Sequence, residues 1–134
     1  MKALTIAQPY AHLILTGEKR VENRTWNPRH RGLLVIHAGK SREWLDTHSP
    51  LPEGMVFGAA LGTVDVVMVV HIDTINSWRR NPALCPIPYQ WICFHEHTEG
   101  LWCWILEDPK PFPEPIKCQG ALGLWEFEMP TSNG

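Results

Sequence analysis

Short apolar segments separated by turn residues make up most of the chain, and their lengths suit β-strands better than long helices. The longest apolar run, GAALGTVDVVMVVHI at residues 58–72, predicts a central strand that bends at Gly62. Shorter alternating or buried patterns predict further strands at residues 4–6, 20–26, 33–38, 101–108 and 121–129.

Helix signals are fewer. Pro9 and Gly17 are placed to begin and end one helix. Ser41 can cap a second, short helix over residues 41–46.

Two segments lack a regular pattern. Residues 76–100 predict a long excursion with one helical turn near Trp78, in a position to cover a cleft. The proline-rich residues 109–120 predict an extended loop.

With 12 Pro and 10 Gly in 134 residues, turns are frequent and the elements between them are short. The predicted fold class is α+β, mainly β: a small, partly closed β-barrel of five to six strands with a few short helices. This length fits a single domain over residues 1–134, with residues 129–134 as a frayed tail.

Composition narrows the function classes. A formal net charge of −2 argues against a broad electrostatic grip on nucleic acid but permits a small basic site. The sequence shows neither a signal peptide nor a membrane span, so we expect a cytoplasmic protein with no membrane partner. The four cysteines form no CxxC, so we expect their thiols to be reduced. The segment CFHEHTE at residues 93–99 lacks both HExxH and a downstream PCxxC, so we expect no metal and no cofactor.

The stretch GEKRVENRTW at residues 17–26 concentrates polar groups beside apolar ones. Strand alternation puts Glu22, Arg24 and Trp26 on one side, with Lys19 at the turn that leads into the strand. These groups either form a solvated strand edge or converge on a ligand.

Other polar residues are candidates with ordinary alternatives. His37 interrupts an apolar strand and is a candidate ligand-binding residue. Lys40 and Ser41, which follow that strand, can hold a phosphate or carboxylate, or form a plain capped turn. Leu34 in place of glycine excludes a phosphate-binding loop. Asp65 interrupts an apolar strand, where it either pairs with an arginine at the rim or joins a polar cleft.

The seven tryptophans divide into two groups. Three lie on strand patterns and are predicted to pack in the core: Trp102, Trp104 and Trp125. Four lie at element ends or in loops, where they either plug a barrel mouth or stack on a base: Trp26, Trp44, Trp78 and Trp91.

The chain resembles an ASCH domain of the PUA-like superfamily. The hallmark G-x-K-x-x-E-x-R is matched at Gly17, Lys19, Glu22 and Arg24, and similar flanking segments extend the resemblance from about Ala3 to Trp125. It implies a PUA-like pseudo-barrel whose cleft carries the hallmark residues, and a function in binding RNA or other nucleic acids.

One branch of this family removes acetyl from N(4)-acetylcytidine with a Lys–Thr–Glu arrangement. The resemblance places Lys19 and Asp65 at two of those positions, while Glu22 stands where the threonine nucleophile would be. An enzyme of this kind would therefore need a water-mediated reaction, with Lys19 as base and Glu22 or Asp65 activating water.

Three functions follow as alternatives. The leading one is recognition of RNA, another nucleic acid or a modified nucleotide: Lys19 and Arg24 donate, Glu22 accepts from an exocyclic amine, and Trp26 or Trp78 stacks on the base. The second is the amidohydrolase. The third is a structural or protein-interaction module in which the hallmark charges only close the barrel.

Overall fold

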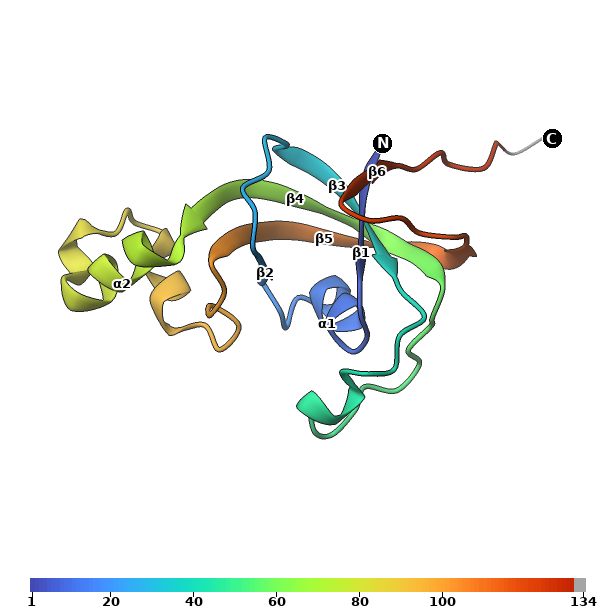
Figure 1. The fold of residues 1–134 in the computed structure, drawn as a ribbon, viewed down its shortest axis with the longest axis horizontal. Helices are drawn as coiled ribbons and strands as arrows, with labels where there is room; N and C mark the ends of the chain where they lie inside the picture. The colour runs from blue at the N-terminus through green and yellow to red at the C-terminus, as the bar shows by residue number, and fades with distance from the viewer. Residues whose placement is uncertain (132–134) are drawn as a thin grey trace.

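The structure, a computed structural model, describes residues 1–131 and contains one curled six-stranded sheet (Figure 1). The strand order is β2-β5-β4-β3-β1-β6; β1 pairs with β3 in parallel, and the other pairs are antiparallel. The strands are β1 (Lys2–Ile6), β2 (Val21–Arg24), β3 (Gly32–Ala38), β4 (Ala59–His71), β5 (Trp102–Lys117) and β6 (Leu124–Glu126). The predicted fold class, mainly β with a partly closed barrel of five to six strands and a few short helices, is confirmed.

Helix α1 (Tyr10–Thr16) packs against β3, β4 and β5 on the concave side of the sheet (Figure 1). Pro9 precedes its first turn, and Gly17 ends it in the left-handed region with φ of 86°, where glycine carries no steric penalty. Its apolar face joins Leu34, Val64 and Trp104 in the main core. The helix expected between Pro9 and Gly17 is confirmed.

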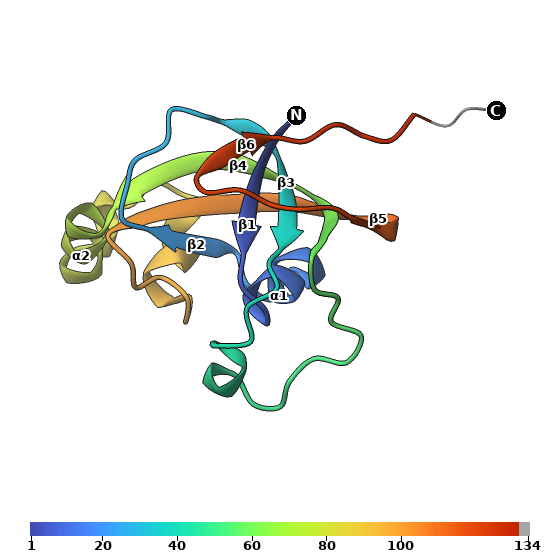
Figure 2. The same ribbon diagram turned by 45° about the vertical axis from the view of Figure 1, so that its right-hand side comes forward.

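Residues 72–94 are more regular than the sequence suggested. Helix α2 (Ile72–Arg80) continues directly from β4, and two 3₁₀ turns follow, η2 (Pro82–Leu84) and η3 (Tyr89–Phe94). They form one end of the molecule (Figure 2), where Ile75, Trp78 and Ile92 fill a second apolar core. Within residues 1–131, no helix is long and apolar enough to cross a membrane.

The extended loop predicted over residues 109–120 is wrong for residues 109–117, because β5 runs to Lys117, and Lys110, Pro111, Ile116 and Lys117 pair with β4. Beyond residue 106, β2 no longer covers the other side of β5. Prolines stand at positions 109, 111, 113 and 115, and of these only Pro111 lies opposite a β4 residue, because the register shifts leave residues 112–115 without a partner on β4. Proline is tolerated on a free strand edge, which is where these residues lie.

The helix predicted over residues 41–46 is also wrong. Ser41 Oγ accepts the N–H of Glu43, two residues on, at 3.2 Å, which forms a local turn instead of a helix cap. A single 3₁₀ turn, η1 (Leu45–Thr47), follows it.

The pairing of β4 with β5 is irregular next to Gly62. A Cβ at this position would lie 2.4 Å from Lys110 O and 2.7 Å from Pro111 Cα, so only glycine allows the two strands to approach this closely. The final strand, β6, is shorter than the nine residues predicted for it. Part of the predicted frayed tail, residues 132–134, lies outside the described residues.

Candidate functional site

The hallmark side chains form a continuous chain of ion pairs. Lys19 Nζ lies 3.1 Å from Glu22 Oε1, and Arg24 Nη2 lies 2.8 Å from Glu22 Oε2. Arg24 Nε donates to the same Oε2 at 3.0 Å, and Lys19 Nζ also donates to the Val21 carbonyl. Glu22 is therefore the shared acceptor of two cations, which offsets the cost of its burial.

Local structure explains this convergence. The backbone N–H of Lys19 donates to Leu13 O at 3.0 Å, which holds the residue against the end of α1. Glu22 and Arg24 are two residues apart on β2, so their side chains leave the same face of the strand.

Arg24 also joins two strands that are not neighbours in the sheet. Its Nη2 donates to the Thr5 carbonyl of β1 at 3.1 Å, while β2 and β1 are separated by three strands in the sheet order. This contact bridges the gap between the curled ends of the sheet. Its Nη1 makes no hydrogen bond with the described residues.

The ion-pair chain lies in a cleft of about 410 Å³ between β1, α1 and β2, which we call the motif cleft. Its lining residues are Thr5, Ile6, Ala7, Tyr10, Lys19, Glu22, Asn23, Arg24, Trp44, His97 and Glu99. Volumes of this order are typical of small-ligand sites.

An exposed tryptophan borders the motif cleft. The Trp44 side chain is 46% exposed and belongs to the segment just before η1. Thr47 Oγ1 donates to Trp44 O at 2.6 Å and lies 2.5 Å from the Tyr10 hydroxyl. These two bonds attach the loop after β3 to helix α1, and so place an open aromatic face at the cleft.

The opposite wall is fixed by Asn23. Its Nδ2 donates to His97 O at 2.7 Å, and its Oδ1 accepts the Gly100 N–H at 2.8 Å. A Cβ on Gly100 would lie 2.2 Å from Asn23 Cβ, so this approach requires glycine. Burial, together with the charge of Lys19, lowers the pKa of His97, which favours its neutral form in the cleft.

The structure does not bring all the predicted residues to the motif cleft. Trp26 packs edge-on against Trp104, with ring centroids 5.0 Å apart, and Trp78 lies in the core beneath α2 with 8% of its surface exposed. Asp65 alternates with the buried Val64 and Val66 on β4 and therefore faces away from the core that those residues fill. The basis for grouping Asp65 with Lys19 is thus absent.

His37, Lys40 and Ser41 lie apart from the hallmark charges. His37 is 2% exposed and bonded to Thr5 and Cys118, and it lines a separate groove together with Lys40. Ser41 Oγ is engaged in its local turn and does not line that groove.

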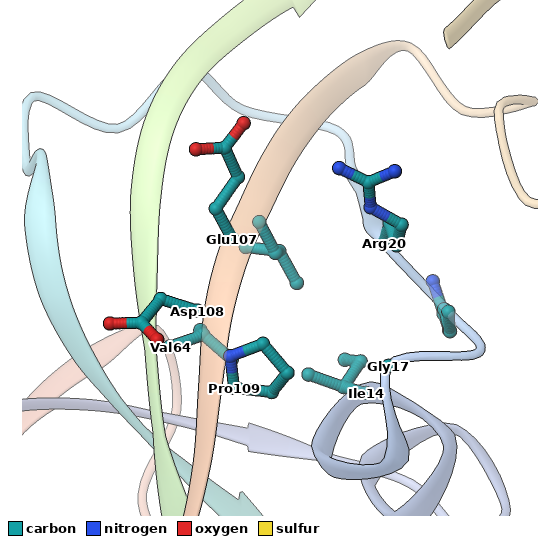
Figure 3. Close-up of a pocket in the computed structure, with 9 residues that line it drawn as sticks. Ile14, Gly17, Arg20, Val64, Glu107, Asp108 and Pro109 are labelled. Carbon is teal, nitrogen blue, oxygen red and sulfur yellow. The ribbon is translucent and has the colours of Figure 1, made fainter. Parts of the chain in front are cut away.

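Lys19 also lines a second cavity, of about 350 Å³. Figure 3 shows Arg20 on one side of this cavity and Glu107 and Asp108 of β5 on the other, with Ile14 and Pro109 between them. Asp65 pairs in register with Glu107 but does not line the cavity.

The sequence did not assign eight of the cleft residues to the site: Thr5, Ile6, Ala7, Tyr10, Asn23, Trp44, His97 and Glu99. Asn23 lies inside the hallmark, where strand alternation directed attention to the opposite face. Trp44 is one of the four tryptophans for which the sequence allows either plugging of a barrel mouth or stacking on a base. No local pattern distinguishes it from the other three.

Comparison with known proteins is consistent with this geometry. The family model for the ASCH domain matches residues 4–116. The chain therefore belongs to the ASCH domain family.

Similar proteins are distant in sequence. Mouse activating signal cointegrator 1 is 24% identical over 145 residues, and the human protein of the same name is 23% identical. Each match covers 98% of this chain but 23% of the relative, so the chain spans less than a quarter of these relatives.

Among solved structures, the ASCH protein of Zymomonas mobilis shares the fold with a TM-score of 0.57 at 19% identity. The match covers 95% of this chain and 87% of that one. A mutant of the same protein, in which a tyrosine is replaced by phenylalanine, gives a TM-score of 0.56, also at 19% identity.

Proposed function

We propose that the motif cleft binds a nucleotide, either free or as part of a nucleic acid strand. The observation that carries this proposal is that a partly free arginine and an open tryptophan line one cleft, next to the hallmark ion pairs. The Arg24 side chain is 26% exposed and keeps Nη1 unengaged among the described residues, so it can donate to a phosphate or to a base carbonyl. Trp44 supplies a flat surface on which a base can stack.

The charges of the motif cleft favour one nucleotide over a long polyanion. Lys19 and Arg24 face Glu22 and Glu99, so the ionised groups nearly balance. A long strand held only here would need a surplus of cations. A single base with one phosphate requires directed donors more than net charge.

Hydrolysis receives less support from the geometry. A lysine that acts as a general base needs a free lone pair near the substrate. Lys19 is 4% exposed, paired with Glu22 and bonded to the Val21 carbonyl, and Asp65 lies on another face. The structural alternative rests on a real contact, because Arg24 also closes the barrel through Thr5.

Calorimetric titration with nucleoside monophosphates tests the proposal. We expect saturable binding that weakens about tenfold in Arg24→Gln and in Trp44→Ala, because a charge-assisted hydrogen bond or a stacked base contributes roughly 1–3 kcal/mol. Arg80→Gln is the matched control: Arg80 is exposed at the end of α2 and does not line the cleft. Melting temperatures of all variants establish that the titrated proteins are folded.

The alternatives predict different outcomes. Release of cytidine from N(4)-acetylcytidine, lost in Lys19→Met, would establish the hydrolase instead. Absence of nucleotide binding in the wild type, with Arg24→Gln lowering only the melting temperature, would favour the structural role.

A further inference from the structure

A groove larger than either of the cavities that Lys19 lines lies beside the motif cleft and shares Thr5 with it. Its volume is about 920 Å³, and it is formed where β3 and β5 end and β4 begins. Lys40 and Lys117 line it, and its lining includes neither aspartate nor glutamate among residues 1–131. We call it the basic groove. Its charge is thus unlike that of the motif cleft, where carboxylates balance the cations.

A third cation borders the basic groove. The Arg42 guanidinium lies over the Phe57 ring, 4.4 Å from its centroid, and Phe57 lines the groove. Lys40 and Lys117 are both exposed, so their ammonium groups can reach a ligand without losing a protein partner. Three cations around one groove provide the electrostatic contacts that phosphates need.

The wall of the basic groove is a rigid hydrogen-bonded unit. Trp125 Nε1 donates to Thr5 Oγ1 at 3.1 Å. The Thr5 hydroxyl can then donate its own proton to His37 Nδ1, which lies 3.1 Å from Thr5 Oγ1. His37 Nε2 lies 2.8 Å from the Cys118 carbonyl, which can only accept, so Nε2 carries a proton. This chain of bonds fixes the position of the loop that follows β5.

Residues 119–122 of that loop line the groove. A Cβ on Gly120 would lie 2.3 Å from Thr5 Oγ1 and 2.8 Å from the His37 ring, so glycine is needed for the loop to approach its wall. The N–H groups of residues 119–122 make no hydrogen bond with the described part of the chain. Free backbone N–H groups beside lysines are suitable donors for phosphate oxygens.

The basic groove and the motif cleft share one residue, Thr5. Its carbonyl accepts from Arg24 on the cleft side, and its hydroxyl bonds His37 on the groove side. A nucleotide seated in the motif cleft therefore has its neighbours along a strand next to the basic groove.

We propose that the basic groove holds the sugar-phosphate backbone of a single-stranded nucleic acid whose adjacent nucleotide occupies the motif cleft. This inference rests on the proposed function and names its ligand class, an oligonucleotide instead of a free nucleoside. It also gives a role to Lys40, for which the sequence left an anion site and a plain capped turn as alternatives.

The test compares one nucleotide with a short strand. Affinities for CMP, UMP and AMP are measured alongside the RNA pentamers C5, U5 and A5 and their DNA counterparts, which distinguish a requirement for the 2′-hydroxyl. The groove variant is Lys40→Met with Lys117→Met. Its charge-matched control is Arg29→Gln with Arg80→Gln, two exposed arginines that line neither the cleft nor the groove.

We expect the wild type to bind a pentamer at least tenfold more tightly than the matching monophosphate at low salt. The groove variant should lose most of that gain while its affinity for the monophosphate stays within about twofold. The slope of log affinity against log salt should fall by about 1.4 for two lost contacts to a single strand. The arginine control should keep both the gain and the slope.

Equal affinity for pentamer and monophosphate would overturn this inference and leave the proposed function standing. So would a pentamer gain that survives in the groove variant. Pentamer binding that responds to the lysines but not to Arg24→Gln would also overturn it, because the strand would then not be anchored in the motif cleft. Absence of binding to either ligand refutes the proposed function itself.

Discussion

Glu22 connects the hallmark side chains, because its carboxylate pairs with both Lys19 and Arg24. Lys19 is almost fully buried beside it, and Arg24 reaches from it to Thr5. A buried ion pair gives little net stability over an apolar pair, but removal of one partner leaves a charge that is costly to bury. Loss of the Glu22 carboxylate should therefore lower the free energy of unfolding by more than the buried surface area of this side chain would suggest.

We expect Glu22→Gln to lower the free energy of unfolding by about 3 kcal/mol, because Lys19 would remain buried without its counter-charge. Urea denaturation measures this change. Glu126→Gln is the control, since Glu126 pairs with Lys2 and the N-terminus at the exposed surface and should leave the free energy nearly unchanged. Equal effects of the two substitutions would contradict the role given to Glu22.

At the scale of elements, the segment that contains η3 is docked to the hallmark through histidine. The Arg20 N–H donates to His95 Nε2 at 3.0 Å, and the Arg20 guanidinium lies 3.8 Å from the Trp91 ring centroid. Burial, with His97 and Lys19 nearby, lowers the pKa of His95, and the charge of Glu96 opposes this only in part. A protonated Nε2 could not accept the Arg20 bond.

This docking should weaken in acid. Because the pKa of His95 is lower in the folded chain than in the unfolded one, its contribution to stability is complete above about pH 6.5 and is lost as the pH falls through the lowered value. We expect His95→Gln, whose amide oxygen can still accept from Arg20, to reduce the fall in unfolding free energy between pH 7.5 and pH 5.

Urea denaturation at both pH values measures the effect, and hydrogen exchange over residues 89–100 locates it. His30→Gln, at an exposed loop, should retain the wild-type pH dependence. A wild-type pH response in His95→Gln would show that another group titrates with the docking.

The sequence predicted those elements whose signals are local. Pro9 and Gly17 bound α1 as expected, and alternation identified β2 with Glu22 and Arg24 on one face. The sequence predicts only one helical turn near Trp78, where the structure has the whole of α2. Ile72, Ile75 and Trp78 recur every three residues, but Ile72 also ends the apolar run that predicts the central strand, which hides the start of the helix.

Other features depended on partners distant in the chain. The prolines of β5 are compatible with a strand only because β2 ends before reaching them, and no pattern within residues 109–117 reports where β2 ends. Trp44 reaches the cleft through the bond between Thr47 and Tyr10, 37 residues away. The hallmark thus located the site, while the aromatic wall and the barrel closure required the three-dimensional structure.

At the scale of the whole molecule, the curled sheet leaves part of β5 with a free edge beyond the end of β2. An uncovered strand edge is a template for pairing with another chain, and proline prevents this because it offers no N–H. Four alternating prolines lie along this stretch, at residues 109, 111, 113 and 115. We infer that they keep the edge from associating with a second copy.

Pro113→Thr with Pro115→Thr should therefore promote association, because threonine restores two N–H donors in a stretch that has no partner strand and favours strand geometry. Both prolines are exposed, so the core stays unchanged and the monomer should still fold. Light scattering coupled to size exclusion, over a hundredfold range of protein concentration, should show dimers or larger species that the wild type does not form under the same conditions.

Pro86→Thr, in the exposed loop before η3, adds the same chemistry away from the sheet and should behave as the wild type does. If the double variant behaves as the wild type at every concentration, the twist of β5 and its charged neighbours, such as Lys110 and Glu114, protect the edge without help from proline.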